Sequence, residues 1–543
     1  MALLPSAHVD SFTRDNLPPP DAWPELRFDL PELRYPDRLN CAVELLDRRL
    51  EEGFGDRPAL FCGEETWTYR HLSRTVDRVA SVLTREMGLV PGNRVLLRGT
   101  NTPWMFACWL ACVKAGMVVV ATMPLLRAAE LRPIIAKARI GAALCEAALV
   151  DELRAAAAPE LTRIVCYGGP DTELERLAAA QPERFRAVET SQDDVCLLAF
   201  TSGTTGEPKA CVHFHRDVMA MCDTFARHIL KPRPGDVFTG TPPLAFTFGL
   251  GALLAFPFRF GCATALPRGA GPAGVAEAVQ RHGVTTIFTS PTAYRAVLGQ
   301  LKPGDLGTVH TCVSAGEALP KATSDAWFEA TGIRIVDGIG ATEMIHIFIS
   351  AAGDDIRPGA TGRPVPGYEA CLLDEEDRPV EGPGTGRLAV RGPTGCRYLA
   401  DPRQAKYVVK GWNVTGDTYR RDEDGYYWFV ARADDMIVSG GYNIAGPEVE
   451  QALLAHPQVA ECAVVGAPDA ERGMLVKAFV VPRDPSLAGP ALVKELQDFV
   501  KARIAPYKYP RAVEFTDALP KTQTGKVQRF VLRQREMERA ATA

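Results

Sequence analysis

The chain has 543 residues, of which 46% are hydrophobic and 23% charged, the composition of an ordinary globular protein. At about 150 residues per domain, this length predicts three or four folding units. The formal net charge is -5 and the isoelectric point is near 6.1, so the sequence offers no basic surface for nucleic acid or for an anionic membrane. We therefore expect neither of these as a partner.

Export and membrane insertion are not expected either. The first residues lack the basic region and apolar run of a signal peptide. The apolar stretch 104–126 carries Lys114 and Gly116 near its middle, so we interpret it as a buried helix, a turn and a strand rather than a membrane span. The fourteen cysteines show no paired spacing, which predicts reduced thiols and a cytoplasmic protein.

The first part of the chain shows the alternation of strand-like and helix-like segments that is typical of an α/β protein. An extended arm reaches to about Leu33, and helical segments cover 39–88 around a strand pair at 58–69. Strand-like apolar runs then alternate with helix-like segments. These runs lie at 94–97, 117–120 and 142–145. Such alternation predicts a parallel sheet in a first α/β subdomain.

A second alternating series extends from Val195 to about Phe348 and predicts a second α/β subdomain. Its strand-like runs lie at 195–200, 285–288, 308–314 and 333–337. Residues 359–429 are dense in Gly and Pro, which predicts a small β-barrel-like subdomain of short strands and turns.

The texture changes again after Ala433, where a compact α+β unit is predicted. Its helices are expected at 448–455 and 491–504, and its strands at 459–465 and 475–481. The expected fold class is therefore α/β. A large N-terminal domain at 1–432 would hold the two α/β subdomains and the barrel-like subdomain, and a smaller α+β domain would occupy 433–543.

The strongest chemical signal is the loop Thr201-Ser202-Gly203-Thr204-Thr205-Gly206-Glu207-Pro208-Lys209, which directly follows an apolar strand. Its glycines and hydroxyl residues supply many N–H and O–H donors, and Lys209 supplies a cation, so the loop suits a polyphosphate. Its composition alone fits a polar surface turn equally well. It is not a Walker A loop, because Gly206 is not followed by Lys and then Ser or Thr.

This loop resembles the phosphate loop of the adenylate-forming superfamily, which comprises acyl-CoA synthetases, adenylation domains and luciferases. Five segments in the superfamily's order carry the resemblance: 201–209, 339–343, 415–417, 432–437 with 439–444, and 520–526. Two departures are small, since Ile339 replaces an aromatic residue and Ala431 a glycine. Taken singly, each segment is also compatible with a helix cap, a turn or a surface lysine.

The resemblance implies a reaction in two halves, with ATP, Mg²⁺ and coenzyme A. A carboxylate first attacks the α-phosphorus of ATP to give an acyl-adenylate and pyrophosphate, and the CoA thiol then displaces AMP. Thr342 would donate to the α-phosphate, Glu343 would hold Mg²⁺, and Lys209 would neutralise phosphate charge. Loop residues Thr201, Ser202, Gly203, Thr204, Thr205 and Gly206 would wrap the phosphates.

The resemblance also implies a nucleotide slot. Asp417 would accept hydrogen bonds from the ribose hydroxyls and Arg432 would add a ribose or phosphate contact. The adenine slot would be formed by Ala315, Gly316, Glu317, Asp337, Gly338, Ile339 and Gly340.

Lys526 would reach the reacting oxygens during adenylation and withdraw for thioester formation. The smaller domain is therefore expected to be mobile and to rotate about a hinge at Asp434. Gly440, Gly441 and Tyr442 would then line the CoA tunnel.

The acyl pocket gives a weaker signal. Phe246 and Phe248 offer aromatic faces and Gly249 would leave room for a ring, although ordinary core packing explains these residues too. Ala315 and Gly340 would complete the wall, and His213 and His346 are candidates for a polar contact to a ring substituent, whereas His215 is expected to be structural.

The chain is most similar to the benzoate and 2-aminobenzoate ligases of this superfamily, at its N-terminal arm (8–20) and at 209–215. We expect 2-aminobenzoate and then benzoate as the preferred acid. Two other interpretations remain: a free-standing enzyme that loads a carrier-protein thiol, and a non-catalytic nucleotide-binding protein. The latter is disfavoured because Lys209, Glu343 and Lys526 are all present. A monomer or a homodimer is expected.

Overall fold

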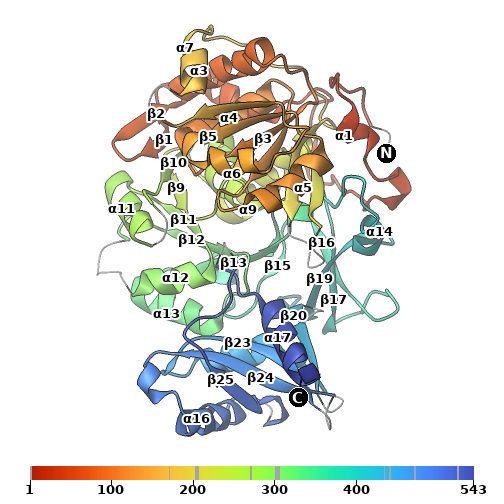
Figure 1. Ribbon diagram of the computed structural model, residues 1–543, viewed down its shortest axis with the longest axis vertical. Coiled ribbons are helices and arrows are strands. Elements are labelled where there is room, and N and C mark those ends of the chain that lie inside the picture. The colour runs from red at the N-terminus through yellow and green to blue at the C-terminus, as the bar shows by residue number, and fades with distance from the viewer. Residues whose placement is uncertain are drawn as a thin grey trace.

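The computed structural model describes residues 3–169, 172–201, 207–269, 272–299, 306–432, 435–439, 442–469, 473–504, 506–522 and 525–542. Three sheets lie in the larger, N-terminal part of the chain, and a fourth sheet forms a smaller C-terminal unit. That unit is drawn in blue at the lower end of the long axis in Figure 1, beneath the strands of the larger part.

The first sheet has six strands in the order β6-β5-β3-β4-β7-β8. Its strands are β3 (Arg94–Arg98), β4 (Val118–Thr122), β5 (Ala142–Glu146), β6 (Arg163–Tyr167), β7 (Val195–Thr201) and β8 (Lys209–Phe214). All neighbours are parallel except β7 and β8, which form an antiparallel pair. Its helices are α3 (Tyr69–Ser81), α4 (Pro103–Lys114), α5 (Ala128–Ala138), α6 (Val150–Ala155) and α7 (Glu173–Ala179). Every residue of β3 and β4 is buried, as expected for central strands of a parallel sheet.

The apolar stretch 104–126 is a buried helix followed by a turn and a strand, as its sequence predicts. Helix α4 and strand β4 occupy it. Lys114 at the end of α4 is almost fully buried. Its charge is compensated by two ion pairs, since its Nζ lies 2.8 Å from Asp47 and 2.6 Å from Asp77. Across the described ranges, none of the helices combines the length and apolarity that a bilayer crossing requires.

The second sheet has nine strands in the order β15-β14-β13-β12-β11-β9-β10-β1-β2, and its central six are parallel. Its strands are β1 (Pro58–Cys62), β2 (Glu65–Thr68), β9 (Val237–Gly240), β10 (Ala263–Leu266), β11 (Thr286–Thr289), β12 (Thr311–Ala315), β13 (Ile335–Gly340), β14 (Ile347–Ser350) and β15 (Arg363–Pro364). Its helices are α8 (His215–Met221), α9 (Thr247–Gly249), α10 (Phe256–Arg259), α11 (Pro272–His282), α12 (Pro291–Leu298) and α13 (Lys321–Thr331).

The boundary between the two sheets differs from the boundary that the sequence pattern predicts between the two α/β subdomains. The prediction that the second series begins at Val195 is wrong, because β7 and β8 complete the first sheet, whereas the early hairpin β1–β2 joins the second. Hydrophobic alternation shows that a segment is a strand. It does not show which distant strand will satisfy its backbone hydrogen bonds.

Residues 359–429 form mainly short strands, as predicted. The third sheet is antiparallel, with the order β16-β17-β19-β18 and β20 paired to β19. Its elements are β16 (Glu369–Leu373), β17 (Gly384–Arg391), α14 (Gln404–Tyr407), β18 (Val408–Val409), β19 (Trp412–Arg421) and β20 (Tyr427–Arg432). The described pairings form an open, branched sheet.

The C-terminal unit has a sheet in the order β22-β21-β24-β23, with β25 paired to β24. Its elements are β21 (Met436–Ser439), β22 (Tyr442–Ala445), α15 (Gly446–Leu454), β23 (Val459–Asp469), β24 (Gly473–Pro482), α16 (Pro490–Lys501), β25 (Ala512–Phe515) and α17 (Arg529–Thr542). The predicted helices and strands correspond to α15, β23, β24 and α16. Two apolar clusters consist wholly of residues from this unit, which supports the domain boundary that we propose near Ala433.

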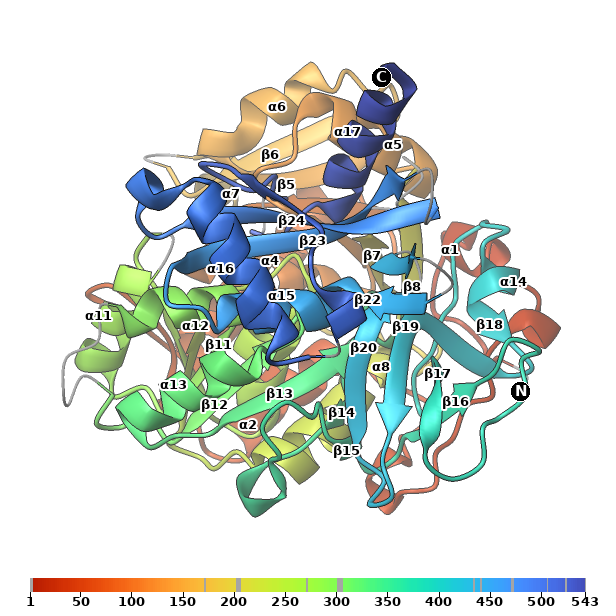
Figure 2. The same cartoon turned by 90° about the horizontal axis from the view of Figure 1, so that it is seen from below.

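Short elements complete the chain. They are α1 (Phe12–Asp15), η1 (Pro20–Ala22), η2 (Pro31–Leu33), η3 (Val43–Asp47), α2 (Arg48–Glu51), η4 (Val82–Glu86), η5 (Ala147–Leu149), η6 (Cys222–Leu230), η7 (Leu250–Ala255), η8 (Thr342–Met344), η9 (Gly353–Asp355), η11 (Pro485–Leu487) and η12 (Pro506–Lys508). Viewed from below, the C-terminal unit lies in front of the larger part (Figure 2). Helix α15 contacts both α13 and β20, so the two parts meet at these two elements.

Candidate active site

The hairpin of β7 and β8 presents the two ends of the predicted phosphate loop. Thr201 ends β7 and pairs with Lys209, which begins β8. The loop residues Ser202, Gly203, Thr204, Thr205 and Gly206 lie outside the described residues. Within the part of the chain that the structure describes, the buried hydroxyl oxygen of Thr201 has no hydrogen-bond partner. An unsatisfied hydroxyl at this place is available to a ligand.

Lys209 and Glu343 come together although 134 positions separate them in the sequence, because η8 lies against the β7–β8 hairpin. Lys209 Nζ lies 3.6 Å from Glu343 Oε1. Tyr398, which has no sequence signal of its own, bridges the pair. Its hydroxyl donates to Glu343 Oε1 at 2.5 Å and accepts from Lys209 Nζ at 2.9 Å. Burial and the Glu343 carboxylate raise the pKa of Tyr398 far above its usual value, so the phenol keeps its proton.

Glu343 fits the hard cation that the sequence motif implies. Its side chain is about one-tenth exposed, and its described hydrogen bond and ion pair engage Oε1, leaving Oε2 for a further ligand. Carboxylate oxygen is the donor that Mg²⁺ prefers, and Mg²⁺ takes most of its other ligands from water and phosphate. A single protein carboxylate is therefore compatible with such a site.

A strained turn directs Glu343 and His346 to different surroundings. Ile345 has φ +64° and ψ −36°, a backbone conformation that β-branched residues rarely adopt. Backbone strain of this kind costs about 1–3 kcal/mol and often lies at functional sites. Glu343 contacts the Lys209–Tyr398 pair, whereas His346, three residues later, is enclosed by aromatic rings.

His213 is hydrogen-bonded to the short helix η8, which carries Thr342 and Glu343. Its side chain is fully buried, and Nε2 donates to the backbone carbonyl of Thr342 at 2.8 Å. Its Nδ1 lies 3.8 Å from Asp217 Oδ2. With both nitrogens directed at protein atoms, this geometry favours a positioning role for His213 over the substrate contact expected from the sequence.

The adenine-slot residues lie at the carboxyl ends of neighbouring parallel strands. Strands β12 and β13 pair with Ala315 opposite Gly338, so Gly316, Glu317, Ile339 and Gly340 follow at one edge of the sheet. A Cβ on Gly340 would lie 2.7 Å from the His346 carbonyl oxygen, and a Cβ on Gly338 would meet the Ile347 side chain. Both glycines are thus required by close packing.

Asp337 is the most perturbed acid of this slot. Burial raises its pKa from 3.8 to about 8, and its Oδ1 is enclosed without a hydrogen-bond partner. Between these two pKa values the folded chain binds a proton that the unfolded chain lacks. The free energy of unfolding therefore falls as pH rises toward about 8 on account of this group.

Asp337→Asn should remove this contribution. We expect the gain in melting temperature over wild type to be larger near pH 9 than near pH 5, because the wild-type carboxyl must ionise in a buried site only at high pH. Thermal unfolding of the two nucleotide-free proteins across that range measures the difference. An equal gain at both pH values would contradict the raised pKa.

The ribose residues meet across two antiparallel strands. Asp417 on β19 pairs with Arg432 at the end of β20, and Arg432 Nε lies 3.5 Å from Asp417 Oδ1. The Arg432 side chain is 59% exposed, so it can reach a ligand as well as Asp417.

Lys526 of the C-terminal unit reaches this slot. Its Nζ lies 3.6 Å from the position that a Cβ on Gly316 would take. Loss of hydration between the two parts lowers its pKa, Arg432 lowers it further, and the carboxylates of Glu317 and Asp417 oppose that shift. The structure therefore places the predicted lysine beside the predicted nucleotide residues.

The remaining predictions for the C-terminal unit have less structural support. Asp434, Gly440 and Gly441 lie outside the described residues, and Tyr442 is described only by its backbone in β22. The hinge and the CoA tunnel stay predictions.

Aromatic rings surround the buried imidazole of His346, one of the predicted acyl residues. His346 lies 5.7 Å from Phe248, 5.5 Å from Phe225 and 4.5 Å from Phe256 between ring centroids. Burial lowers its pKa to about 3, so the ring is neutral, and neither nitrogen makes a hydrogen bond of normal geometry to the residues that the structure describes. Phe248 and His346 were predicted as acyl residues, and that role stays a prediction; Phe225 and Phe256, which lie in apolar segments without a motif, were not predicted but contact the same imidazole.

The other acyl predictions have mixed outcomes. Phe246 is half-buried directly before α9, and Ala315 is buried at the end of β12. Gly249 does not leave space for a ring, because its Cβ position lies 2.0 Å from the Pro243 carbonyl oxygen. The missing side chain instead lets α9 pack against the preceding backbone, so the prediction for Gly249 is wrong.

Two family models match this chain: the AMP-binding enzyme over residues 47–398 and the AMP-binding enzyme C-terminal domain over residues 448–526. The chain belongs to the AMP-binding enzyme family. The fold and the arrangement of Lys209, Glu343 and Lys526 are in keeping with that membership.

Several relatives act on aryl acids, by their names. The chain is 37% identical over 516 residues to the benzoate–CoA ligase of Thauera aromatica, a match that covers 93% of this chain and 97% of that protein. It resembles the crystal structure of an anthranilate CoA ligase in complex with anthranoyl-AMP, with 34% identity, a TM-score of 0.89 and coverage of 94% and 100% of the two chains. A benzoate CoA ligase structure from Burkholderia xenovorans LB400 gives 32% identity, a TM-score of 0.83 and coverage of 91% and 100%.

Proposed function

We propose that this chain is an ATP-dependent aryl carboxylate–CoA ligase. It forms an acyl-adenylate with release of pyrophosphate and then an acyl-CoA thioester with release of AMP. We further propose 2-aminobenzoate as the preferred acid, followed by benzoate. The relatives named above support the reaction class. The choice of acid is supported by the neutral His346 and by the aromatic cage around it, which consists of Phe225, Phe248 and Phe256.

The first half-reaction brings a carboxylate to a polyphosphate, so positive charge and hydrogen-bond donors are needed where the anions meet. Lys209 on β8 and Lys526 from the C-terminal unit supply the cations. Thr342 supplies a hydroxyl donor and is held by His213 through its carbonyl. Mg²⁺, when bound at Glu343, would neutralise phosphate charge.

The second half-reaction needs the same acyl carbon to be reached by a thiol. Lys526 lies beside Gly316 in this structure, so the C-terminal unit has to move before CoA can approach the acyl carbon. We propose a rotation of the C-terminal unit about Asp434, with Gly440 and Gly441 lining the path of CoA.

The cage around His346 suits an aromatic acid with a polar ring substituent. Three phenylalanine rings contact the imidazole, and aryl groups pair favourably with such rings. A neutral imidazole has one nitrogen that donates and one that accepts. Both are without a normal hydrogen-bond partner, and an amino group on the ring of the acid would satisfy one of them.

His346→Leu should therefore lower the ratio of kcat/KM for 2-aminobenzoate over benzoate by about 10-fold, the worth of one buried hydrogen bond. The melting temperature should not fall, because the substitution removes an unsatisfied buried polar group. An unchanged ratio in a folded variant would remove His346 from the acid site.

A panel of aryl and alkyl acids, assayed for AMP formation with CoA, tests the proposed function itself. We expect 2-aminobenzoate to exceed benzoate and both to exceed alkyl acids. Replacing CoA with a carrier protein as acceptor separates the CoA ligase from a carrier-loading enzyme. AMP formation without dependence on any aryl acid would contradict the proposal.

A further inference from the structure

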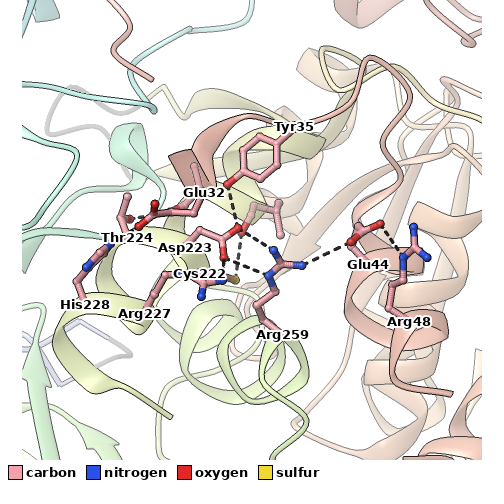
Figure 3. Close-up of polar contacts among 12 residues, drawn as sticks. Glu32, Tyr35, Glu44, Arg48, Cys222, Asp223, Thr224, Arg227, His228 and Arg259 are labelled. Atoms are coloured by element: carbon pink, nitrogen blue, oxygen red, sulfur yellow. Dashed lines mark hydrogen bonds and ion pairs between the residues drawn. The ribbon is translucent and has the colours of Figure 1, made fainter. Parts of the chain in front are cut away.

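A buried carboxylate lies behind the aromatic cage and takes no part in the chemistry described above. Asp223 belongs to η6, and its side chain has no exposed surface. Its Oδ1 accepts from Arg227 at 2.7 Å and from Arg259 Nε at 3.2 Å, while its Oδ2 accepts from Arg259 Nη2 at 3.0 Å and from the Tyr35 hydroxyl at 3.1 Å. Figure 3 shows these donors converging on the carboxylate.

The two arginines differ in what they connect. Arg227 lies one turn further along the same helical segment as Asp223 and is 39% exposed, so its ion pair ties η6 only to itself. Arg259 is the last residue of α10 and donates two parallel hydrogen bonds to Asp223. This two-point contact fixes both the distance between η6 and α10 and their relative orientation. The Tyr35 hydroxyl also links Asp223 to the segment that follows η2.

The same two elements carry two of the three phenylalanine rings of the cage. Phe225 is two residues after Asp223, and Phe256 is three residues before Arg259. Their ring centroids lie 5.8 Å apart, and both rings contact His346. Any shift of η6 against α10 therefore changes the separation of these rings and the space around the imidazole.

Apolar packing alone would tolerate such a shift, because aromatic contacts are broad in angle and distance. A buried, two-point ion pair does not tolerate it, since each lost hydrogen bond leaves a charge unsatisfied in a water-poor interior. Glu44, at 3.5 Å from Arg259, holds the far side of the guanidinium, and Figure 3 shows it continuing the network toward Arg48.

We infer that Asp223 is a positioning residue for the acid substrate, whose ion pair with Arg259 sets the separation of Phe225 and Phe256 and so determines which acids fit against His346. The inference rests on the proposed function, because it takes the His346 cage as the acid site. Asp223 acts through Phe225 and Phe256 and touches neither ATP nor the reacting atoms.

Asp223→Asn keeps the shape of the side chain and removes the charge. We expect KM for 2-aminobenzoate and benzoate to rise about 10-fold, KM for ATP to stay within about 2-fold, and the preference for aryl over alkyl acids to weaken. A merely structural residue would not separate the two KM values. The measurement is steady-state AMP formation with each acid and with ATP varied in turn.

Two more variants keep the test decisive if the asparagine variant does not fold. Tyr35→Phe removes one hydrogen bond to Asp223 and should raise the acid KM about 2- to 5-fold, again without changing KM for ATP. Arg227→Gln is the matched control: it removes an arginine from the same carboxylate but leaves the tie to α10, so the acid profile should stay as in wild type.

The outcomes separate the inference from the function on which it rests. If Tyr35→Phe and any folded Asp223 variant keep the wild-type acid profile, or if Arg227→Gln shifts it equally, the positioning role is wrong. If wild type itself shows no preference for aryl acids, the proposed function fails first. Phe256→Leu tests the cage separately. If this variant changes the acid profile while Tyr35→Phe and Asp223→Asn do not, the cage binds the acid but the ion pair does not position it.

Discussion

Lys526→Ala is expected to slow acyl-adenylate formation by about 10²–10³-fold, the usual effect of removing one preorganised group that stabilises developing charge. Lys526 Nζ lies beside Gly316, and the charges of Glu317, Asp417 and Arg432 act on its pKa. Transfer of the acyl group from supplied acyl-adenylate to CoA should be largely spared, because the lysine must leave the site for that step. Pyrophosphate release and CoA-dependent AMP release measure the two halves separately.

Lys521→Ala is the matched control for this variant. Lys521 precedes Lys526 by five residues, and its Nζ pairs with Glu461 at 2.6 Å within the C-terminal unit. A partly exposed pair of this kind contributes little, so both half-reactions should stay within about 2-fold of wild type. Equal loss of both halves in Lys526→Ala would contradict the assigned role.

Glu343→Gln is expected to lower adenylation by at least about 100-fold and to raise the Mg²⁺ concentration needed for half-maximal activity. Glutamine keeps the shape and can still accept from Tyr398, but it lacks the charge that holds a divalent cation. Activity titrated with Mg²⁺ at saturating ATP gives the shift. The same Mg²⁺ dependence in variant and wild type would show that Glu343 does not hold the metal.

Two tyrosines provide a graded comparison. Tyr398→Phe removes the hydroxyl that donates to Glu343 and should cost about 10-fold in apparent Mg²⁺ affinity, as loss of a partner of a metal ligand usually does. Tyr407, whose ring lies 5.8 Å from that of Tyr398, has a buried hydroxyl that none of the described residues hydrogen-bonds. Tyr407→Phe should therefore leave the Mg²⁺ dependence unchanged.

Much of the secondary structure could be predicted because it follows from the local pattern of hydrophobic residues. The runs at 94–97 and 142–145 are strands, and the helix and strands expected after Glu448 are present with ends shifted by a few residues. Strand β25 and helix α17 were not predicted. α17 is highly charged and has low mean hydropathy, so it lacks the apolar stripe that the pattern requires.

Part of the site could be predicted for a similar reason. Motifs such as Thr342–Glu343 and Thr415–Asp417 are contiguous, so their chemistry is visible in the sequence itself. Tyr398, Phe225 and Asp223 have no such context. Tyr398 meets Lys209 across 189 positions, and Asp223 meets Tyr35 across 188. Only the folding of distant segments onto one another creates these contacts.

The sequence by itself determined the class of chemistry, because cations, hydroxyls and carboxylates in short ordered motifs require no fold to be recognised. The tertiary structure alone decided the surroundings of those groups: that His213 faces the Thr342 carbonyl, that His346 is neutral and enclosed by rings, and that Gly249 serves packing. The physical reason is that burial and pairing depend on which remote segments exclude water from a side chain, and spacing along a chain carries no information about that.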